Sequence, residues 1–194
     1  MNKIGEIIES TATEFTAECY ELNAMPALGS LVKITDSAVE VFGIVCQSGT
    51  SSIEPGRRPV ARGKDEASEE AVYQSSPQLL KLLRSEFKVV VVGHKLNGMI
   101  YQYVPAKPVH IHAFVQECSP AEIKEFSQSF DFLGILVNNR LEIPVEELVA
   151  AALREMSKAQ PDSRAFLISG GKALTNILSG DYRRLKTILA RLKR

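Results

Sequence analysis

The segment 169–172, Ser-Gly-Gly-Lys, comes close to a phosphate-binding motif. A P-loop needs a glycine five residues before its Gly-Lys pair and a Ser or Thr after it, so that backbone N–H groups wrap the phosphate and a hydroxyl holds magnesium. Here Phe166 occupies the glycine position and Ala173 the hydroxyl position, so the motif fails twice. A looser anion-binding turn remains an alternative. We favour a helix kink or a close helix–helix contact.

Two histidines, His110 and His112, stand two residues apart in a predicted strand, so both would project from one face. With Cys118 as a third ligand they could hold zinc. The chain has no Cys-x-x-Cys pair, and residues 105–116 contain neither Asp nor Glu. We therefore favour a structural histidine pair at the junction of the two halves of the chain, and we expect no metal ion and no cofactor.

The three cysteines, Cys19, Cys46 and Cys118, lie scattered in apolar runs. We expect reduced core thiols of a cytoplasmic protein, with a single disulfide as the open alternative. None of them stands in a motif that would lower its pKa, and the chain has no Gly-x-Ser-x-Gly segment that could present a serine nucleophile. Nucleophilic catalysis is therefore unsupported, and we expect a protein that is not an enzyme.

The overall charge excludes a general attraction to polyanions. The 194 residues contain 23 Lys and Arg against 23 Asp and Glu, so no net field draws the chain onto nucleic acid or anionic lipid. Any such binding has to be local. No run of about 18 apolar residues occurs, and acidic residues interrupt the N-terminal apolar stretch, so we expect no signal peptide and no membrane contact.

Residues 181–194 combine the clearest helical periodicity with the sharpest charge asymmetry. Six basic residues stand against one acidic residue, a net charge of +5. Cations near a helix C-terminus interact favourably with its dipole, so a solvated face is the ordinary interpretation. The alternative is docking onto an acidic protein or a phosphate backbone. The basic residues are Arg183, Arg184, Lys186, Arg191, Lys193 and Arg194.

Residues 1–116 show the pattern of a β-barrel. Gly29 and Gly43 stand where a strand must bend or admit another backbone closely. Both faces of residues 39–46 are apolar, so another part of the chain or a partner must cover the sheet from outside. The sequence contains seven β segments, a number that predicts about six barrel strands plus one closing segment. The seven β segments are residues 4–10, 15–22, 27–34, 39–50, 87–93, 99–104 and 109–115.

A long insertion, residues 48–76, interrupts the barrel pattern with Gly, Pro and charged residues. It buries too little apolar surface to offset the entropy of ordering its backbone, so we expect it to be mobile and to become ordered on a partner. A short helix over residues 77–85 should follow and lie across the barrel. The insertion's basic half, which we expect to meet carboxylates on a partner, contains Arg57, Arg58, Arg62 and Lys64.

A change of hydrophobic period from 2 to 3.6 after Cys118 marks the start of a helical domain, residues 117–194. Ser119, Pro120 and Glu122 occupy the N-cap, N1 and N3 positions of a capping box, so the first helix begins there.

The remaining helical signals predict a small bundle. Residues 145–156 form one apolar stripe, Asp162 can cap a further helix, and residues 182–192 form the last and clearest amphipathic face. Residues 132–137 are an apolar run that the pattern does not assign. The predicted fold class is α+β, a barrel of approximately six strands with a long insertion, followed by the helical bundle.

Several segments of residues 1–115 resemble the HAS barrel, the β-barrel shared by HerA-type DNA-translocating ATPases and rotary ATP synthases. The attached ATPase has no counterpart in these residues. In HerA-like proteins the barrel helps to order subunits and dock partners, so the resemblance implies an assembly or adaptor role. The matching segments are residues 4–8, Phe15, residues 26–34, residues 41–45 and the proline-rich residues 105–110, with Gly5, Gly29 and Gly43 as the glycines of the barrel motif.

We therefore expect a non-catalytic assembly or adaptor module that docks to a multi-subunit partner such as a HerA-like ATPase. The alternative is a nucleic-acid-binding accessory protein that uses the basic C-terminal helix, although the chain lacks Trp and an aromatic platform for stacking bases. A homo-oligomer is left open.

Overall fold

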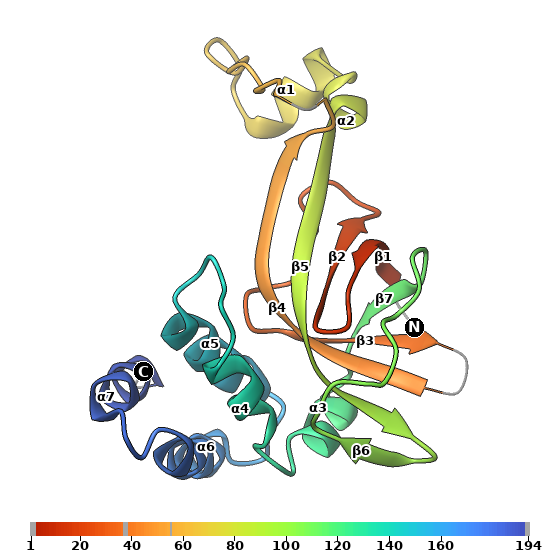
Figure 1. The fold of residues 1–194 in the computed structure, drawn as a ribbon. Helices are drawn as coiled ribbons and strands as arrows, with labels where there is room; N and C mark the ends of the chain where they lie inside the picture. Colours follow the sequence, from red (N-terminus) through yellow and green to blue (C-terminus); the bar gives the residue numbers. More distant parts are fainter. Residues whose placement is uncertain (1–2, 37–38, 55, 193–194) are drawn as a thin grey trace.

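The computed structural model describes residues 3–36, 39–54 and 56–192, and Figure 1 shows its β-barrel and helices. Six antiparallel strands follow one another in the order β2-β1-β7-β3-β4-β5, and β2 pairs with β5 to close the barrel. This confirms the predicted barrel of about six strands. The barrel strands are β1 (Lys3–Ser10), β2 (Glu14–Cys19), β3 (Leu31–Asp36), β4 (Val39–Ser52), β5 (Leu83–Leu96) and β7 (Phe114–Glu117), and β6 (Met99–Tyr101) is added beside β5.

Strand β4 belongs to two hydrophobic cores. Val41 and Val45 are buried inside the barrel with Phe15, whereas Phe42 and Ile44 are buried on the outer side against helices. The two-sided apolar pattern arises because the outer face of this wall is covered by the C-terminal half of the chain. The prediction of a cover is therefore confirmed, and the cover is part of the same chain.

The described part of that half contains five helices, of which α3, α4 and α5 contact the barrel wall. α5 is the central one, because eight of its thirteen residues are buried. α4 corresponds to the apolar run that the sequence pattern left unassigned. The capping box at Ser119 and Glu122 is present, and the Asp162 carboxylate accepts a hydrogen bond from the Ala165 N–H, as predicted. The helices are α3 (Pro120–Phe126), α4 (Phe132–Val137), α5 (Val145–Ser157), α6 (Ser163–Ile177) and α7 (Tyr182–Leu192).

The predicted strands 99–104 and 109–115 are largely wrong. β6 ends at Tyr101, and β7 begins only at Phe114. Pro105 and Pro108 lack the N–H that a sheet ladder requires, so the chain between these strands forms a loop. Gln102 is also drawn away from the sheet, because its side-chain amide donates to the Phe126 carbonyl and accepts from the backbone N–H of α4.

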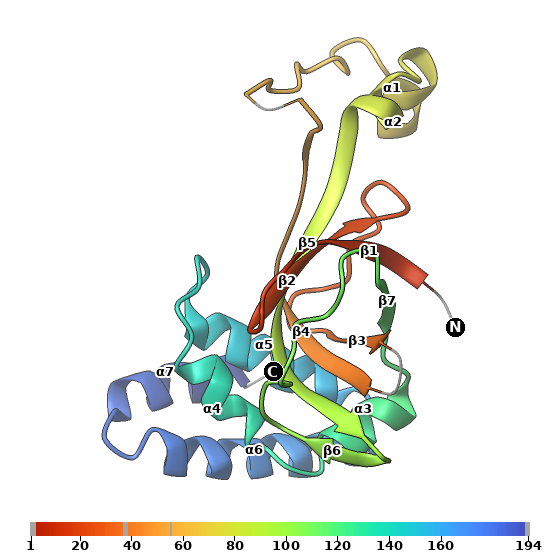
Figure 2. The same cartoon turned by 45° about the vertical axis from the view of Figure 1, so that its right-hand side comes forward.

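The insertion is built differently from the prediction. β4 continues to Ser52 and β5 already begins at Leu83, so a two-stranded ribbon projects from the barrel (Figures 1 and 2). We call residues 49–86 the arm and residues 53–82 its tip. The ribbon forms because polar side chains pair across it; the hydroxyls of Thr50 and Ser85, for example, lie 2.7 Å apart.

Two short helices, α1 (Glu69–Ser75) and α2 (Leu79–Leu82), form part of the tip. The predicted helix over residues 77–85 is therefore too long, since residues 83–85 belong to β5, and its predicted place across the barrel is wrong. The helices lie at the far end of the ribbon (Figure 2). The mobility of residues 48–76 stays a prediction.

Candidate interaction surfaces

The basic half of the insertion lies on the surface of the tip. The Arg57 guanidinium lies 2.7 Å from the Glu54 carboxylate, although both side chains are about half exposed or more. Arg58, Arg62 and Lys64 are also exposed. An exposed pair of this kind contributes little to stability, so Arg57 can exchange its partner easily.

The tip also exposes apolar side chains. Val60 is 75% exposed, Leu80 57% and Ile53 43%. None of the residues of α1 and α2, all of which the structure describes, is buried. Helices this short are marginal unless an apolar face is packed against something. The tip therefore exposes both charged and apolar side chains.

Two arginines of the basic C-terminal helix are bound within the chain. The Arg184 Nε atom donates to the Glu146 carboxylate on α5 at 2.7 Å, and its guanidinium also donates to the Val137 carbonyl at 2.9 Å. Arg191 pairs with Glu147 one residue further along α5. The hydrogen bond from Arg184 lowers the pKa of Glu146. These contacts fasten α7 onto α5.

The other cations of α7 remain on the surface. Arg183 and Lys186 are exposed, and neither forms an ion pair with any residue of the described chain. Lys193 and Arg194 lie outside the described residues. Of the predicted basic residues, Arg184 and Arg191 therefore hold α7 to α5, whereas Arg183 and Lys186 remain exposed.

This division predicts different effects of two neighbouring substitutions. Arg184→Ala should lower the free energy of unfolding by about 1.5–3 kcal/mol, because it removes hydrogen bonds of a charged group to α5 and α4. Arg183→Ala should change it by about 0.5 kcal/mol or less. Urea denaturation followed by circular dichroism measures both. Equal effects would show that the Arg184–Glu146 contact contributes nothing to the bundle.

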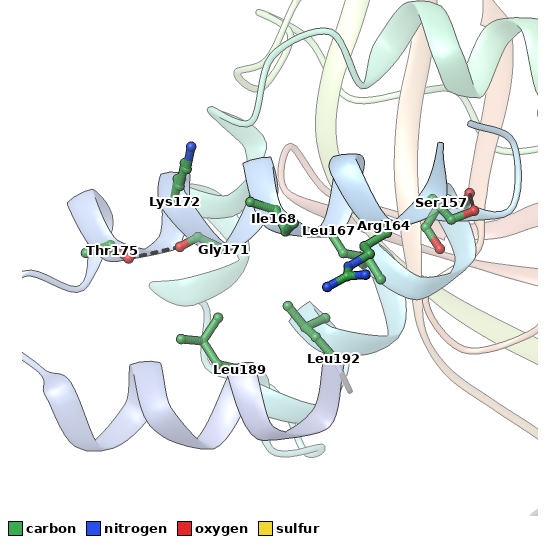
Figure 3. A pocket seen from close by; sticks show the side chains of 10 residues that line it. Ser157, Arg164, Leu167, Ile168, Gly171, Lys172, Thr175, Leu189 and Leu192 are labelled. Carbon is green, nitrogen blue, oxygen red and sulfur yellow. Dashed lines mark hydrogen bonds between the residues drawn. The ribbon is translucent and has the colours of Figure 1, made fainter. Parts of the chain in front are cut away.

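An apolar groove of about 880 Å³ lies between α6 and α7 (Figure 3). Leu167, Ile168, Leu189 and Leu192 line it. Arg164 points into the space between the two helices, whereas Lys172 extends outward from α6. None of the ten residues lining it is acidic. The groove therefore combines an apolar lining with positive charge.

The Gly170-Gly171 pair permits this arrangement. Both glycines are buried within α6, so a phosphate cannot use their N–H groups as a turn. A Cβ at Gly170 would lie 2.9 Å from the Leu153 side chain, and one at Gly171 would lie 3.2 Å from Leu189. The favoured interpretation, a close helix–helix contact, is confirmed. In the sequence, the Gly170-Gly171 pair was the one signal that indicated a close helix contact beside this groove.

His110 and His112 do not project from one face of a strand, as the sequence predicted, because they do not lie in a strand. Both stand in the loop before β7, and His112 has a positive φ of 70°. Its imidazole lies 2.5 Å from the Glu6 carboxylate, which lowers the pKa of Glu6. Within residues 3–36, 39–54 and 56–192, no three His, Cys, Asp or Glu side chains cluster as a metal site would require.

The cysteines are free and buried. Burial raises the pKa of the Cys19 and Cys46 thiols to about 11, and it also raises the pKa of Cys118. A thiol with a raised pKa is protonated at neutral pH, so these groups are poor nucleophiles.

The three barrel glycines lie at close backbone contacts. Gly29 has a φ of +85°, and a Cβ there would lie 2.5 Å from the backbone of Ala151 in α5. Side chains at Gly5 and Gly43 would collide with the Glu18 carbonyl and the Val89 side chain, respectively. Gly29 thus lets the entry to β3 approach the central helix.

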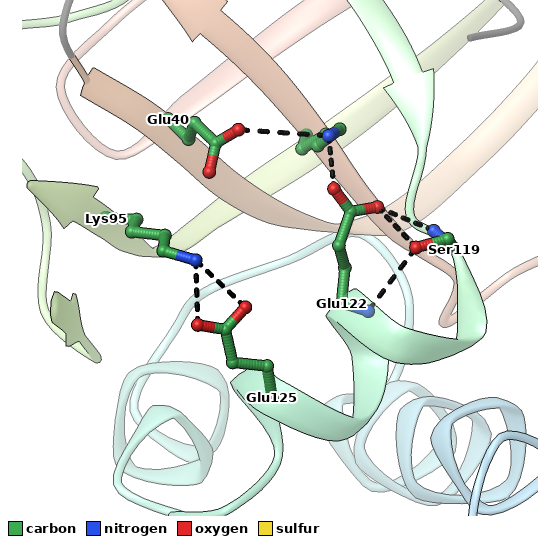
Figure 4. Close-up of polar contacts among 6 residues, drawn as sticks. Glu40, Lys95, Ser119, Glu122 and Glu125 are labelled. Atoms are coloured by element: carbon green, nitrogen blue, oxygen red, sulfur yellow. Dashed lines mark hydrogen bonds and ion pairs between the residues drawn. The ribbon is translucent and has the colours of Figure 1, made fainter. Parts of the chain in front are cut away.

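A buried lysine of the barrel pairs with Glu122, near the start of α3. Figure 4 shows Glu122 beside Ser119, its partner in the capping box. Lys33, on β3, is only 3% exposed, and its ammonium group pairs with Glu122 and lies 3.8 Å from Glu40. Burial opposes its charge, but the hydrogen bond that Lys33 donates to Glu122 prevails, and the pKa of Lys33 is raised. Burial likewise opposes the charge of Glu122, yet its bonds to Lys33 and Ser119 lower its pKa. The sequence pattern did not indicate this junction.

None of the described helices has both the length and the hydrophobicity needed to cross a membrane. A scan of the chain against protein-family models finds no match, and a search of the curated proteins finds no similar sequence. The structure itself shows a closed six-stranded antiparallel β-barrel.

Proposed function

We propose that this chain is a non-catalytic assembly or adaptor module that docks to a multi-subunit partner through its arm. The observation that carries the proposal is the tip of the arm. It holds two helices without a buried residue, and it exposes Val60 and Leu80. Contiguous exposed apolar patches that are rimmed by polar residues are typical of protein interaction sites.

The closed barrel supports the choice of partner class. A six-stranded barrel with Gly5, Gly29 and Gly43 at close backbone contacts is compatible with the HAS barrel that the sequence resembles. A HerA-like ATPase is therefore the proposed multi-subunit partner. Arg58 and Arg62, exposed on the tip, are suited to pair with carboxylates on it.

Nucleic-acid binding by α7 remains the alternative function. This alternative was predicted from the basic residues of α7. Two of them, Arg184 and Arg191, pair with Glu146 and Glu147. Fewer free cations mean fewer neutralised phosphates and a weaker salt dependence. A salt-titrated mobility-shift assay decides this alternative, because the absence of binding at low salt would remove it.

The proposed function is tested by shortening the arm. Replacing residues 53–82 with Asn-Gly should connect Ser52 to Leu83 by a tight hairpin turn and leave the barrel folded. We expect the intact protein to recover a defined multi-subunit complex from its native cells at physiological salt, and the shortened protein to recover none of it. Thermal unfolding of both proteins verifies that the barrel is retained.

A second variant separates the charge of the tip from its length. Arg58→Gln combined with Arg62→Gln and Lys64→Gln keeps the arm and removes three cations, so it should recover the complex in reduced amount. Recovery of the intact protein alone, or equal recovery of the complex by intact and shortened proteins, would overturn the proposed function.

A further inference from the structure

We infer that the groove between α6 and α7 binds the arm tip of a second copy of this chain. The inference rests on the proposed function, in which the tip is a docking element, and adds a contact between the acidic half of the tip and another copy of the chain. It arises from two surfaces of one molecule that are complementary and cannot meet within that molecule.

The groove and the acidic half of the tip carry opposite charges, whereas residues 53–82 as a whole contain five acidic and five basic residues. Residues 65–80 of the tip contain four acidic residues and no basic residue. The groove is lined by Arg164 and Lys172 and by no acidic residue. Charge complementarity of this kind orients partners and suppresses wrong ones.

Both α1 and the groove also present apolar side chains that are at least partly exposed. α1 follows its acidic residues Glu69 and Glu70 with Val72 and Tyr73, and none of these is buried. The groove offers Ile168, which is 51% exposed, beside Leu189 of α7, which is partly exposed. Docking would bury apolar surface on both sides at the same time.

The lengths of the two elements are compatible. α1 has seven residues, which corresponds to about 10 Å of helix. The α6 residues that line the groove run from Arg164 to Thr175, about 17 Å along the axis. The helix and its acidic flank can therefore lie along the groove.

The positions of the two surfaces exclude docking within one molecule. The arm tip lies at one end of the protein and α6 and α7 at the other, in both views (Figures 1 and 2). The arm must therefore reach another copy, whose own arm remains available for the next. Such head-to-tail contacts form a ring if the rotation closes.

Sedimentation of the full chain over a range of concentrations tests the inference. We expect association that weakens as the salt concentration rises, because the charges are exposed. Arg164→Glu with Lys172→Glu should weaken the association by about tenfold or more, and Glu69→Lys with Glu70→Lys should do the same. All four substitutions in one chain should restore the association, since the reversed charges again attract.

A matched control changes the same amount of charge elsewhere. Lys107→Glu with Lys124→Glu, on exposed positions outside the arm and the groove, should leave the association intact. A wild-type chain that stays monomeric at every concentration would overturn the inference, as would association that the groove substitutions leave unchanged. A monomeric chain that still recovers its complex through the arm would overturn only this inference and leave the proposed function standing.

Discussion

Glu122→Gln should lower the free energy of unfolding by about 2–3 kcal/mol, because it leaves the buried Lys33 ammonium group with only the more distant Glu40 carboxylate. Lys33 is 3% exposed, whereas the Glu122 side chain is 28% exposed and can take up water. Lys33→Met should therefore destabilise the protein less than Glu122→Gln. Glutamine can still fill the capping box, so the loss reports on the charge pair.

The matched control is one turn further along α3. Glu125→Gln removes a carboxylate from the more exposed Lys95 pair and should cost about 1 kcal/mol or less (Figure 4). Urea denaturation at neutral pH measures all three variants. If Glu122→Gln costs no more than Glu125→Gln, the buried pair does not hold the barrel to α3.

The same pair predicts a dependence on pH. The pKa of folded Glu122 lies below its ordinary value of 4.5, so its stabilising contribution is complete above that value and is lost as the pH falls through the folded pKa. The pKa of Lys33 is raised, so its contribution persists at neutral pH and is lost only in alkaline solution. Glu122→Gln should flatten the acid side of the stability curve.

Phe42→Ala should lower the free energy of unfolding by about 3–5 kcal/mol, because it leaves a cavity between the barrel wall and the helices. Phe42 is 2% exposed, and its ring lies 5.1 Å from that of Phe126 in α3. Tyr182→Ala is the matched aromatic control; that side chain is 75% exposed, so we expect a change of about 0.5 kcal/mol or less.

Hydrogen exchange in the Phe42→Ala protein tests whether residues 1–116 and 117–194 are separate domains. The two halves share the wall formed by β4 and β5, so we expect the amides of β1 and of α5 to lose protection together. Loss of protection in α5 with full protection in β1 would show that the barrel is stable without its helices.

Local signals in the sequence were sufficient for most of the fold. The two-sided apolar pattern of residues 39–46 predicted a covered barrel wall, and the capping box at Ser119 located the start of α3. Such signals work because strand faces and helix caps depend on neighbouring residues. Residues 132–137 lacked a signal because a short apolar run has the same pattern in a buried strand and in a buried helix.

The sites depend on contacts between distant parts of the chain, which no local pattern contains. Lys33 pairs with Glu122, which follows it by 89 residues in the sequence. Arg184 and Arg191 had the appearance of a free basic face, because their acidic partners belong to α5. The groove likewise exists only once α7 has packed beside α6.

The position of the tip between two paired strands has a consequence for how the arm can change. Closing a flexible loop costs chain entropy that grows only logarithmically, so doubling the length of the tip would cost about 0.6 kcal/mol. The ribbon is less permissive, because one residue inserted into β4 would reverse the side to which every later side chain of that strand points. New sequence can therefore accumulate between residues 53 and 82 while the barrel keeps its register.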